Sequence, residues 1–137
     1  MNVKPLIVDV NKVKSLNFGD TYESRMILDH AITGRDNVIQ INHGTVKAGA
    51  SLEGAIHDED EIYYILSGRG KIKLDDNIFD VYKDQVIFIP KGCFHALYND
   101  ENDEDMLLLT FWRDYRFNSA YEERMKAWGT SFKTIDE

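Results

Sequence analysis

The chain has 137 residues, of which 43% are hydrophobic and 29% are charged, and this balance argues against a disordered or fibrous protein. The length predicts one compact domain spanning residues 1–137. The formal net charge of −8 disfavours electrostatic capture of phosphate backbones or anionic lipids, so we expect neither nucleic acid nor a membrane as a partner.

The cysteine content predicts a reducing compartment. Cys93 is the only cysteine, so it has no partner for an intramolecular disulfide, and thiolate metal sites need several cysteines. No apolar run reaches the roughly 18–20 residues of a membrane span, and the first ten residues lack a hydrophobic signal core. We therefore expect a soluble, cytoplasmic protein.

The middle of the chain is typical of short strands separated by turns. Apolar and polar residues alternate, or β-branched and aromatic residues cluster, in the segments 38–43, 62–66, 71–74, 78–82, 86–89 and 106–112. Turn-forming residues separate these segments at 67–70, 75–77 and 90–92. No helical crossover pattern lies between them. The sequence thus indicates an all-β fold, an antiparallel sandwich or barrel, and of these we predict a single antiparallel β-barrel.

The C-terminal segment changes to a helical period. Ser119 followed by Glu122 fits a capping box, and Tyr121, Met125 and Trp128 fall on one helical face. This pattern predicts one short α-helix over about residues 119–128, packed on the outside of the barrel. A helix that covers a sheet face and a helix that forms a dimer contact both fit the pattern.

Three ionisable residues could meet inside such a barrel. Glu61 opens the apolar strand with its side chain on the same face as Tyr63, and a carboxylate in that interior needs a partner. The polar residues 58–60 can bend the chain so that His57 approaches Glu61, and His95 heads a further strand. Two imidazoles and one carboxylate form the ligand set of a divalent transition metal with open positions. A metal-free hydrogen-bond cluster is the alternative.

Two stretches of the sequence resemble the two motifs of the cupin superfamily. Residues 49–68 read GASLEGAIHDEDEIYYILSG, similar to the first motif G-x5-H-x-H-x3-E-x6-G. Residues 84–99 read DQVIFIPKGCFHALYN, similar to the second motif G-x5-P-x-G-x2-H-x3-N. Each stretch departs from its motif at one position, where Ala55 replaces the first histidine and Asp84 replaces a glycine.

The resemblance to small RmlC-like cupins implies a jelly-roll barrel with one metal ion inside. Carried over by position, the ligands are His57, Glu61 and His95, and the ion is a divalent transition metal such as Fe, Zn, Mn, Ni or Co. Because alanine has no ligand atom, the fourth position at Ala55 is left to water or to another side chain. Glu53 and His43 are the substitutes that the sequence offers: Glu53 shares the face of Ala55 if that strand is regular, and His43 ends the preceding strand.

The resemblance leaves two functions open. The first is a small metal-dependent enzyme of the isomerase, lyase or dioxygenase type that acts on a compact polar metabolite, a sugar or a keto or hydroxy acid, with Tyr63 as the general acid or base. The second is a non-catalytic binding or sensing cupin that has lost tight metal binding. In both cases the partner is a small molecule, and family habit implies a homodimer. The aromatic residues of the last segment also favour a dimer contact, and they are the only support for a third function, a structural dimer module: Tyr115, Phe117, Tyr121 and Trp128. We expect apolar cavity walls from Phe88, Phe94, Leu97, Leu109 and Phe111.

Overall fold

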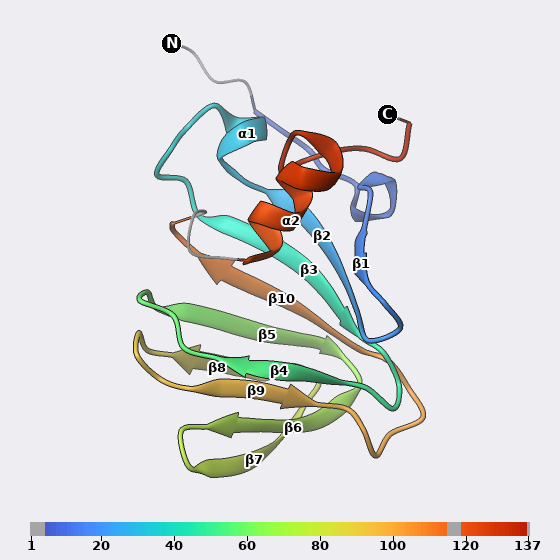
Figure 1. Ribbon diagram of the computed structural model, residues 1–137, viewed down its shortest axis with the longest axis vertical. Coiled ribbons are helices and arrows are strands. Elements are labelled where there is room, and N and C mark those ends of the chain that lie inside the picture. Colours follow the sequence, from blue (N-terminus) through green and yellow to red (C-terminus); the bar gives the residue numbers. More distant parts are fainter. Residues whose placement is uncertain (1–4, 115–118, 137) are drawn as a thin grey trace.

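The computed structural model describes residues 5–114 and 119–136, and most of their regular secondary structure is β-strand (Figure 1). The strands are β1 (Leu16–Phe18), β2 (Tyr22–Leu28), β3 (Gln40–Val46), β4 (Ser51–Ala55), β5 (Glu61–Ser67), β6 (Arg69–Leu74), β7 (Asn77–Tyr82), β8 (Val86–Ile89), β9 (His95–Tyr98) and β10 (Met106–Trp112). The helical elements are a 3-10 turn (Val10–Lys12), α1 (His30–Thr33) and α2 (Ser119–Trp128).

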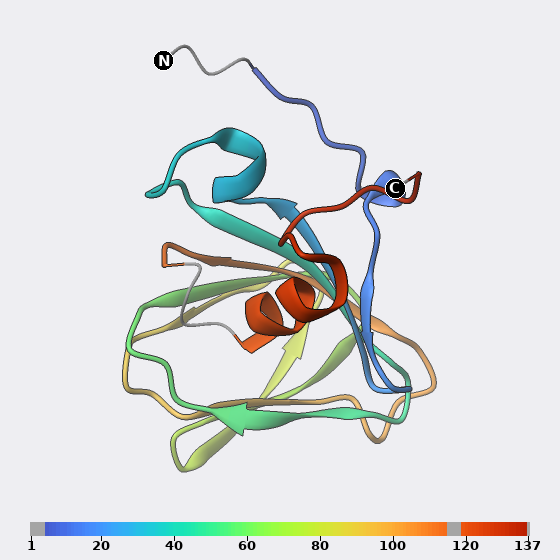
Figure 2. The ribbon, with the colours of Figure 1, turned by 45° about the horizontal axis from the view of Figure 1, so that its top comes forward.

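The strands form two antiparallel sheets that face each other (Figure 2). One sheet has six strands in the order β1-β2-β3-β10-β5-β8, and the other has four in the order β4-β9-β6-β7. The core between them is built from side chains that are almost fully buried: Val46, Ile65, Ile72, Ile89, Leu97, Met106 and Leu108. The predicted all-β jelly roll with a short C-terminal helix is confirmed, as two facing sheets rather than a closed barrel.

Strand alternation decides which side chains enter the space between the sheets. Along β5, Glu61, Tyr63 and Ile65 are buried while the residues between them are partly or largely exposed. On the neighbouring strand β10, Thr110 is the register partner of Tyr63 and is also buried. The inner face of this sheet is therefore polar at one end and apolar at the other.

Helix α2 begins and ends where the sequence predicts, but it turns a different face to the protein. Its end is set by Gly129, which has φ 74° and donates its N–H to the carbonyl of Met125 at 2.9 Å. The predicted apolar face is wrong at Met125, which is 39% exposed, whereas Arg124 is only 1% exposed. Arg124 lies one turn from Tyr121 and Trp128, so a charged side chain takes the inward position.

Membrane-spanning length is missing from the helices in the described ranges. Over residues 5–114 and 119–136, no helix combines the length and the apolar character that a membrane crossing requires.

The backbone conformation of one turn explains why aspartate can replace the glycine of the second motif. Asp84, which stands where the second motif has glycine, has φ 69°, and aspartate is among the few residues that tolerate this region. Its carboxylate accepts a hydrogen bond from the Tyr64 hydroxyl at 3.0 Å, which helps to hold the turn. The motif position therefore demands a conformation, and Asp84 meets that demand.

Replacing Gly68 by alanine is expected to destabilise the fold by about 2–4 kcal/mol, since left-handed strain costs about 1–2 kcal/mol and a steric clash adds to it. Gly68 has φ 83°, and a Cβ there would lie 2.6 Å from the backbone oxygen of Asp105. The matched control is Gly49→Ala, where φ is 78° and nothing lies within 4 Å of the added carbon. Urea denaturation measures both variants, and equal losses of stability would contradict the clash.

Candidate metal centre

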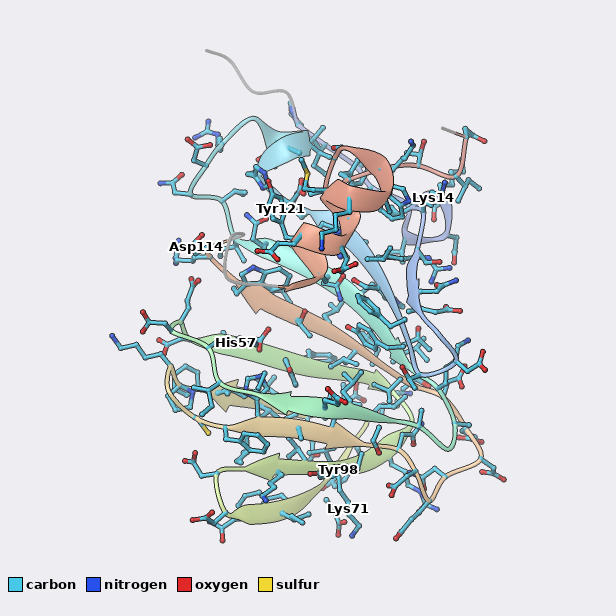
Figure 3. All side chains as sticks on the ribbon, viewed as in Figure 1. Lys14, His57, Lys71, Tyr98, Asp114 and Tyr121 are labelled. Carbon is cyan, nitrogen blue, oxygen red and sulfur yellow. The ribbon has the colours of Figure 1, made fainter. Side chains whose placement is uncertain are left out.

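The loop between β4 and β5 delivers His57 to the second motif. The backbone carbonyl of His57 accepts the N–H of Gly92 at 2.8 Å. Asp60 accepts the backbone N–H of Lys91 at 3.0 Å, and the carboxylate of Glu59 accepts two backbone N–H groups just beyond β10, each at 2.7 Å. The polar segment 58–60 therefore forms the bend that the sequence predicts. Its carboxylates bind the backbone at Lys91 and just beyond β10, which holds the loop on both sides. His57 is labelled in Figure 3.

His57, Glu61 and His95 converge on one point in the cavity between the sheets. Oε1 of Glu61 lies 3.2 Å from Nε2 of His95 and 3.6 Å from Nδ1 of His57, and the three ligand atoms lie within 4.8 Å of one another. Glu61 is 4% exposed and His95 is 6% exposed, so the surrounding protein screens both from water. The two rings stand edge to face, with centroids 5.0 Å apart.

The hydrogen bonding of His95 leaves a place for a cation. Nδ1 of His95 lies 3.1 Å from the carbonyl oxygen of Cys93, which only accepts, so Nδ1 carries the proton. In the neutral ring, Nε2 then turns a lone pair toward Oε1 of Glu61. Within the described ranges, this buried Oε1 accepts no hydrogen bond of normal geometry. Two acceptors face each other here, and a divalent cation fits their chemistry with a small closing of the side chains, since ligand distances are about 2.0–2.2 Å.

The charges of the cluster favour an ionised carboxylate. Burial pushes the pKa of Glu61 upward, but the contacts with His57 and His95 outweigh it and hold this pKa below its ordinary value. For His95, burial lowers the pKa, and the contact with Glu61 and the Cys93 carbonyl together raise it above its ordinary value. Glu61 is therefore an anion at neutral pH, as a metal ligand must be.

Tyr63 lies beside this cluster on the inner face of β5. Its ring stands edge to face with that of His95, with centroids 6.0 Å apart, and the residue is 7% exposed. Burial, followed by the negative charge of Glu61, raises the pKa of Tyr63 well above its usual range. The phenol therefore stays protonated at neutral pH and can act as a hydrogen-bond donor and proton source.

A β-bulge in β4 affects which side chains lie near Ala55, the position where the first motif has a histidine. Ala55 pairs with His95, and Leu52 pairs with Leu97, so β4 has one extra residue between these two pairs. The strand is not regular, which was the condition for Glu53 to share the face of Ala55. Glu53 is exposed and touches the cavity rim without joining the ligand cluster.

His43 also stays outside the cluster. Its neighbours Asn42 and Gly44 are buried, and Asn42 lines the cavity, so His43 points to the opposite face of β3. There burial, together with the positive charge of Arg25, lowers the pKa of His43. Neither substitute that the sequence offers contributes a ligand atom to the three-residue cluster.

The cavity around the cluster has a volume of about 490 Å³, enough for a compact metabolite. Leu97 lines it as predicted, but the other four expected wall residues do not. Phe88 is 58% exposed on the far face of β8, and the ring of Phe94 fills the place of a side chain at Gly54, where an added Cβ would lie 1.9 Å from Cζ. Leu109 and Phe111 lie on the outer face of β10.

Polar residues from β2 and β3 line the cavity in their place. Tyr22, Ser24 and Asn42 face it, and Ala120 of α2 lies at its edge. The sequence prediction missed these residues, although the polar positions at 22 and 24 follow the two-residue spacing of one strand face.

Comparison with known proteins identifies the family. The family model of the cupin domain matches residues 42–112, more than half of the chain. The chain belongs to the cupin family. Both motifs and all three candidate ligands lie within the matched region.

Two curated proteins match parts of this cupin. One is the alginate biosynthesis protein AlgA of Pseudomonas putida, 36% identical over 61 residues, which are 44% of this chain and 13% of AlgA. The other is an uncharacterized protein of Methanocaldococcus jannaschii, 44% identical over 46 residues, which are 34% of this chain and 37% of that protein. The matched segments therefore span only a small part of either relative.

Solved structures share the fold at low sequence identity. A predicted oxalate decarboxylase from Thermotoga maritima superposes with a TM-score of 0.70 at 19% identity, covering 79% of this chain and 98% of that one. An RmlC-like cupin from Shewanella frigidimarina gives 0.68 at 13% identity, with 85% and 96% covered. The polyketide cyclase RemF from Streptomyces resistomycificus gives 0.71 at 20% identity, with 80% of each chain covered. At these identities the likeness establishes the fold alone.

Proposed function

We propose that this cupin is a small metal-dependent enzyme acting on a compact polar metabolite, a sugar or a keto or hydroxy acid. The observation that carries the proposal is the convergence of His57, Glu61 and His95 on one point inside a cavity of about 490 Å³. The buried Oε1 of Glu61, facing Nε2 of His95 at 3.2 Å, supports a cation between them.

The three side chains would hold a divalent transition metal through two imidazole nitrogens and one carboxylate oxygen. When bound, the metal supplies Lewis-acid chemistry and leaves coordination positions for substrate or water. Glu61 offsets part of the positive charge, and the Cys93 carbonyl fixes the ring of His95 through Nδ1 at 3.1 Å. His57, whose side chain is 22% exposed, stands nearest to solvent among the three.

Tyr63 is the residue that we assign to proton transfer in this proposal. Burial and the charge of Glu61 raise its pKa well above the usual range, so the hydroxyl is protonated at neutral pH and would donate a hydrogen bond to an oxygen of the substrate; the positive charge of a bound metal would lower this pKa and favour transfer of the proton. Its place beside His95 supports that role.

Replacing Tyr63 by phenylalanine is expected to slow turnover by about 100-fold while metal stoichiometry stays the same, since positioned acids contribute about 10²–10⁴-fold. A general readout is the exchange of pyruvate methyl protons in D2O, followed by NMR with metal-loaded protein. The matched control is Tyr64→Phe, because the Tyr64 hydroxyl binds Asp84 away from the cavity. Unchanged exchange in the Tyr63 variant would remove Tyr63 from the mechanism.

The missing fourth ligand favours a second candidate, a cupin that binds or senses a small molecule without turnover. Ala55 lines the cavity directly opposite His95, and it offers no ligand atom. Three ligands hold a metal less tightly than four. A protein whose cavity binds a ligand equally well with and without metal fits this alternative.

Metal analysis separates the two candidates. Protein purified without chelators is expected to contain close to one equivalent of Fe, Zn, Mn, Ni or Co by elemental analysis. Protein that stays metal-free after incubation with salts of all five metals would overturn the enzyme proposal in favour of the binding cupin.

We also expect a homodimer in the cytoplasm. The strands β7 and β8 lie at the edges of the two sheets, and they carry large exposed apolar side chains: Ile78, Phe79, Tyr82, Val86 and Phe88. Exposed apolar edges pair readily with a second copy. Tyr115 and Phe117, which the sequence also suggested for a contact, lie outside the described residues. Light scattering is expected to report twice the mass of one chain at micromolar concentration, and the mass of a single chain would contradict it.

A further inference from the structure

A second set of polar side chains crosses the cavity wall from helix α2 to β2, and the metal proposal makes no use of it. Nη1 of Arg124 donates to Oγ of Ser24 at 2.9 Å. Oγ of Ser24 donates to Oδ1 of Asn42 at 2.6 Å, and Nδ2 of Asn42 donates to the hydroxyl of Tyr22 at 3.0 Å. We call these four residues the Arg124–Tyr22 chain.

The direction of every hydrogen bond in the Arg124–Tyr22 chain follows from its first member. A guanidinium group only donates, so Ser24 must accept from Arg124 and give its own proton to Asn42. That bond fixes the amide of Asn42, with its NH2 group toward Tyr22. The Tyr22 oxygen therefore accepts one bond and keeps its own proton to donate.

That proton has no acceptor among residues 5–114 and 119–136, and Tyr22 lines the cavity. Burial, then the charge of Glu61, raises the pKa of Tyr22 to about 12, so the hydroxyl stays protonated at neutral pH. Its ring is held against Gly44, where an added Cβ would lie 2.2 Å from the Tyr22 oxygen. Tyr22 thus presents a fixed donor to whatever fills the cavity.

A positive charge stands behind this donor. Arg124 is 1% exposed, its Nε has no hydrogen-bond partner among the described residues, and no carboxylate of those residues lies within 4.0 Å of it. Asp29 acts on it electrostatically, but its oxygens already accept from the amides of Ala31 and Ile32 and from the hydroxyl of Ser131. A buried cation that is not fully paired favours an anion nearby, and a chain of aligned donors strengthens its last bond.

We propose that Tyr22 binds the carboxylate of a 2-hydroxy or 2-oxo acid, with Arg124, Ser24 and Asn42 as positioning residues. This rests on the proposed function, since the metal cluster would take the other end of the same ligand. It narrows the substrate class, because a neutral sugar gains little from a polarised donor backed by a buried guanidinium, whereas a carboxylate gains a charge-assisted hydrogen bond.

The test is calorimetric binding of lactate and of its neutral analogue lactamide to the metal-loaded protein. In Tyr22→Phe, the affinity for lactate is expected to fall by about tenfold or more, and that for lactamide by less than about threefold, because hydrogen bonds to charged groups are the stronger ones. Tyr64→Phe is the matched control and is expected to bind both as the wild type does. Ser24→Ala, which cuts Arg124 off from Asn42, is expected to reduce the ratio of lactate to lactamide affinity while metal stoichiometry stays unchanged.

Three outcomes overturn the inference. They are wild-type protein that binds no lactate, Tyr22→Phe that binds lactate as the wild type does, and equal losses for lactate and lactamide. Failure of the metal proposal is seen separately. If the wild type binds no metal, the same comparison is made on metal-free protein, where a Tyr22-dependent preference for lactate supports the inference and its absence overturns it.

Discussion

Replacing His95 by alanine is expected to abolish stoichiometric metal binding while the fold persists. His95 supplies one of three ligand atoms, and its loss leaves Glu61 buried beside a single imidazole. The core itself consists of apolar side chains from both sheets, so removing this ring leaves most of the packing intact. Elemental analysis is expected to give less than a tenth of an equivalent of metal, against close to one for the wild type.

The same variant is expected to lose the thermal stabilisation that metal gives the wild type. Metal at about 100 times its dissociation constant adds about 2.7 kcal/mol to stability when only the folded state binds. His43→Ala is the matched control, because His43 lies outside the cavity and outside the ligand cluster. Stoichiometric metal in the His95 variant, or equal loss in the His43 variant, would place the metal elsewhere in the protein.

The candidate cluster was predictable from sequence because motif spacing and strand alternation agreed. Glu61 and Tyr63 are two residues apart on one strand, so a single buried face takes both. The polar run 58–60 predicted the bend that brings His57 back to them, and carboxylates of that run fasten the loop in the structure. Local chemistry was enough for His57, Glu61 and Tyr63, whereas the place of His95 beside them was predicted only through the second motif.

The cavity walls were less predictable, because β10 is apolar on both faces. Its residues from Met106 to Trp112 give no sign in the sequence of which face is inner. In the structure Leu108 and Thr110 point inward and Leu109 points outward, so two of the expected wall residues lie on the wrong face. Pairing with β3 and β5 decides this register, and pairing between distant segments is not written in a local pattern.

Two further differences between prediction and structure lie where segments distant in the sequence come into contact. Amphipathic spacing placed Met125 inward on α2, yet Arg124 is the buried residue because Ser24, one hundred positions earlier, accepts its hydrogen bond. The bulge in β4 includes Gly54, and a glycine inside a strand is a local signal for a bulge that the prediction did not use. The ring of Phe94 occupies the space beside Gly54, and Glu53 lies outside the ligand cluster.

Position 55 lacks the ligand atom that the histidine of the first motif would provide. Ala55 and His95 are register partners across β4 and β9, and Cβ atoms of directly opposed residues lie about 4.5–5.5 Å apart. Ala55 also lines the cavity, so a larger side chain at this position has open space before it. An imidazole at position 55 therefore points to the same region as the ring of His95.

Ala55→His is expected to tighten metal binding by tenfold or more, which corresponds to about 1.4 kcal/mol. Competition against a chelator of known affinity measures the change. Ala55→Leu is the control, because it fills similar space without a ligand atom and is expected to bring no gain. A dissociation constant equal to that of the wild type would mean that position 55 does not reach the metal.

The added ligand is also expected to act against small-molecule binding. A fourth protein ligand takes one of the positions that three ligands leave open, and these positions are where a hydroxy or oxo acid would coordinate. Ala55→His should therefore bind metal more tightly and lactate more weakly than the wild type, measured by calorimetry on the same metal-loaded sample. Tighter binding of both metal and lactate would show that lactate does not occupy an open coordination position of the metal. Alanine at position 55 would then not serve to keep that position free for the small molecule.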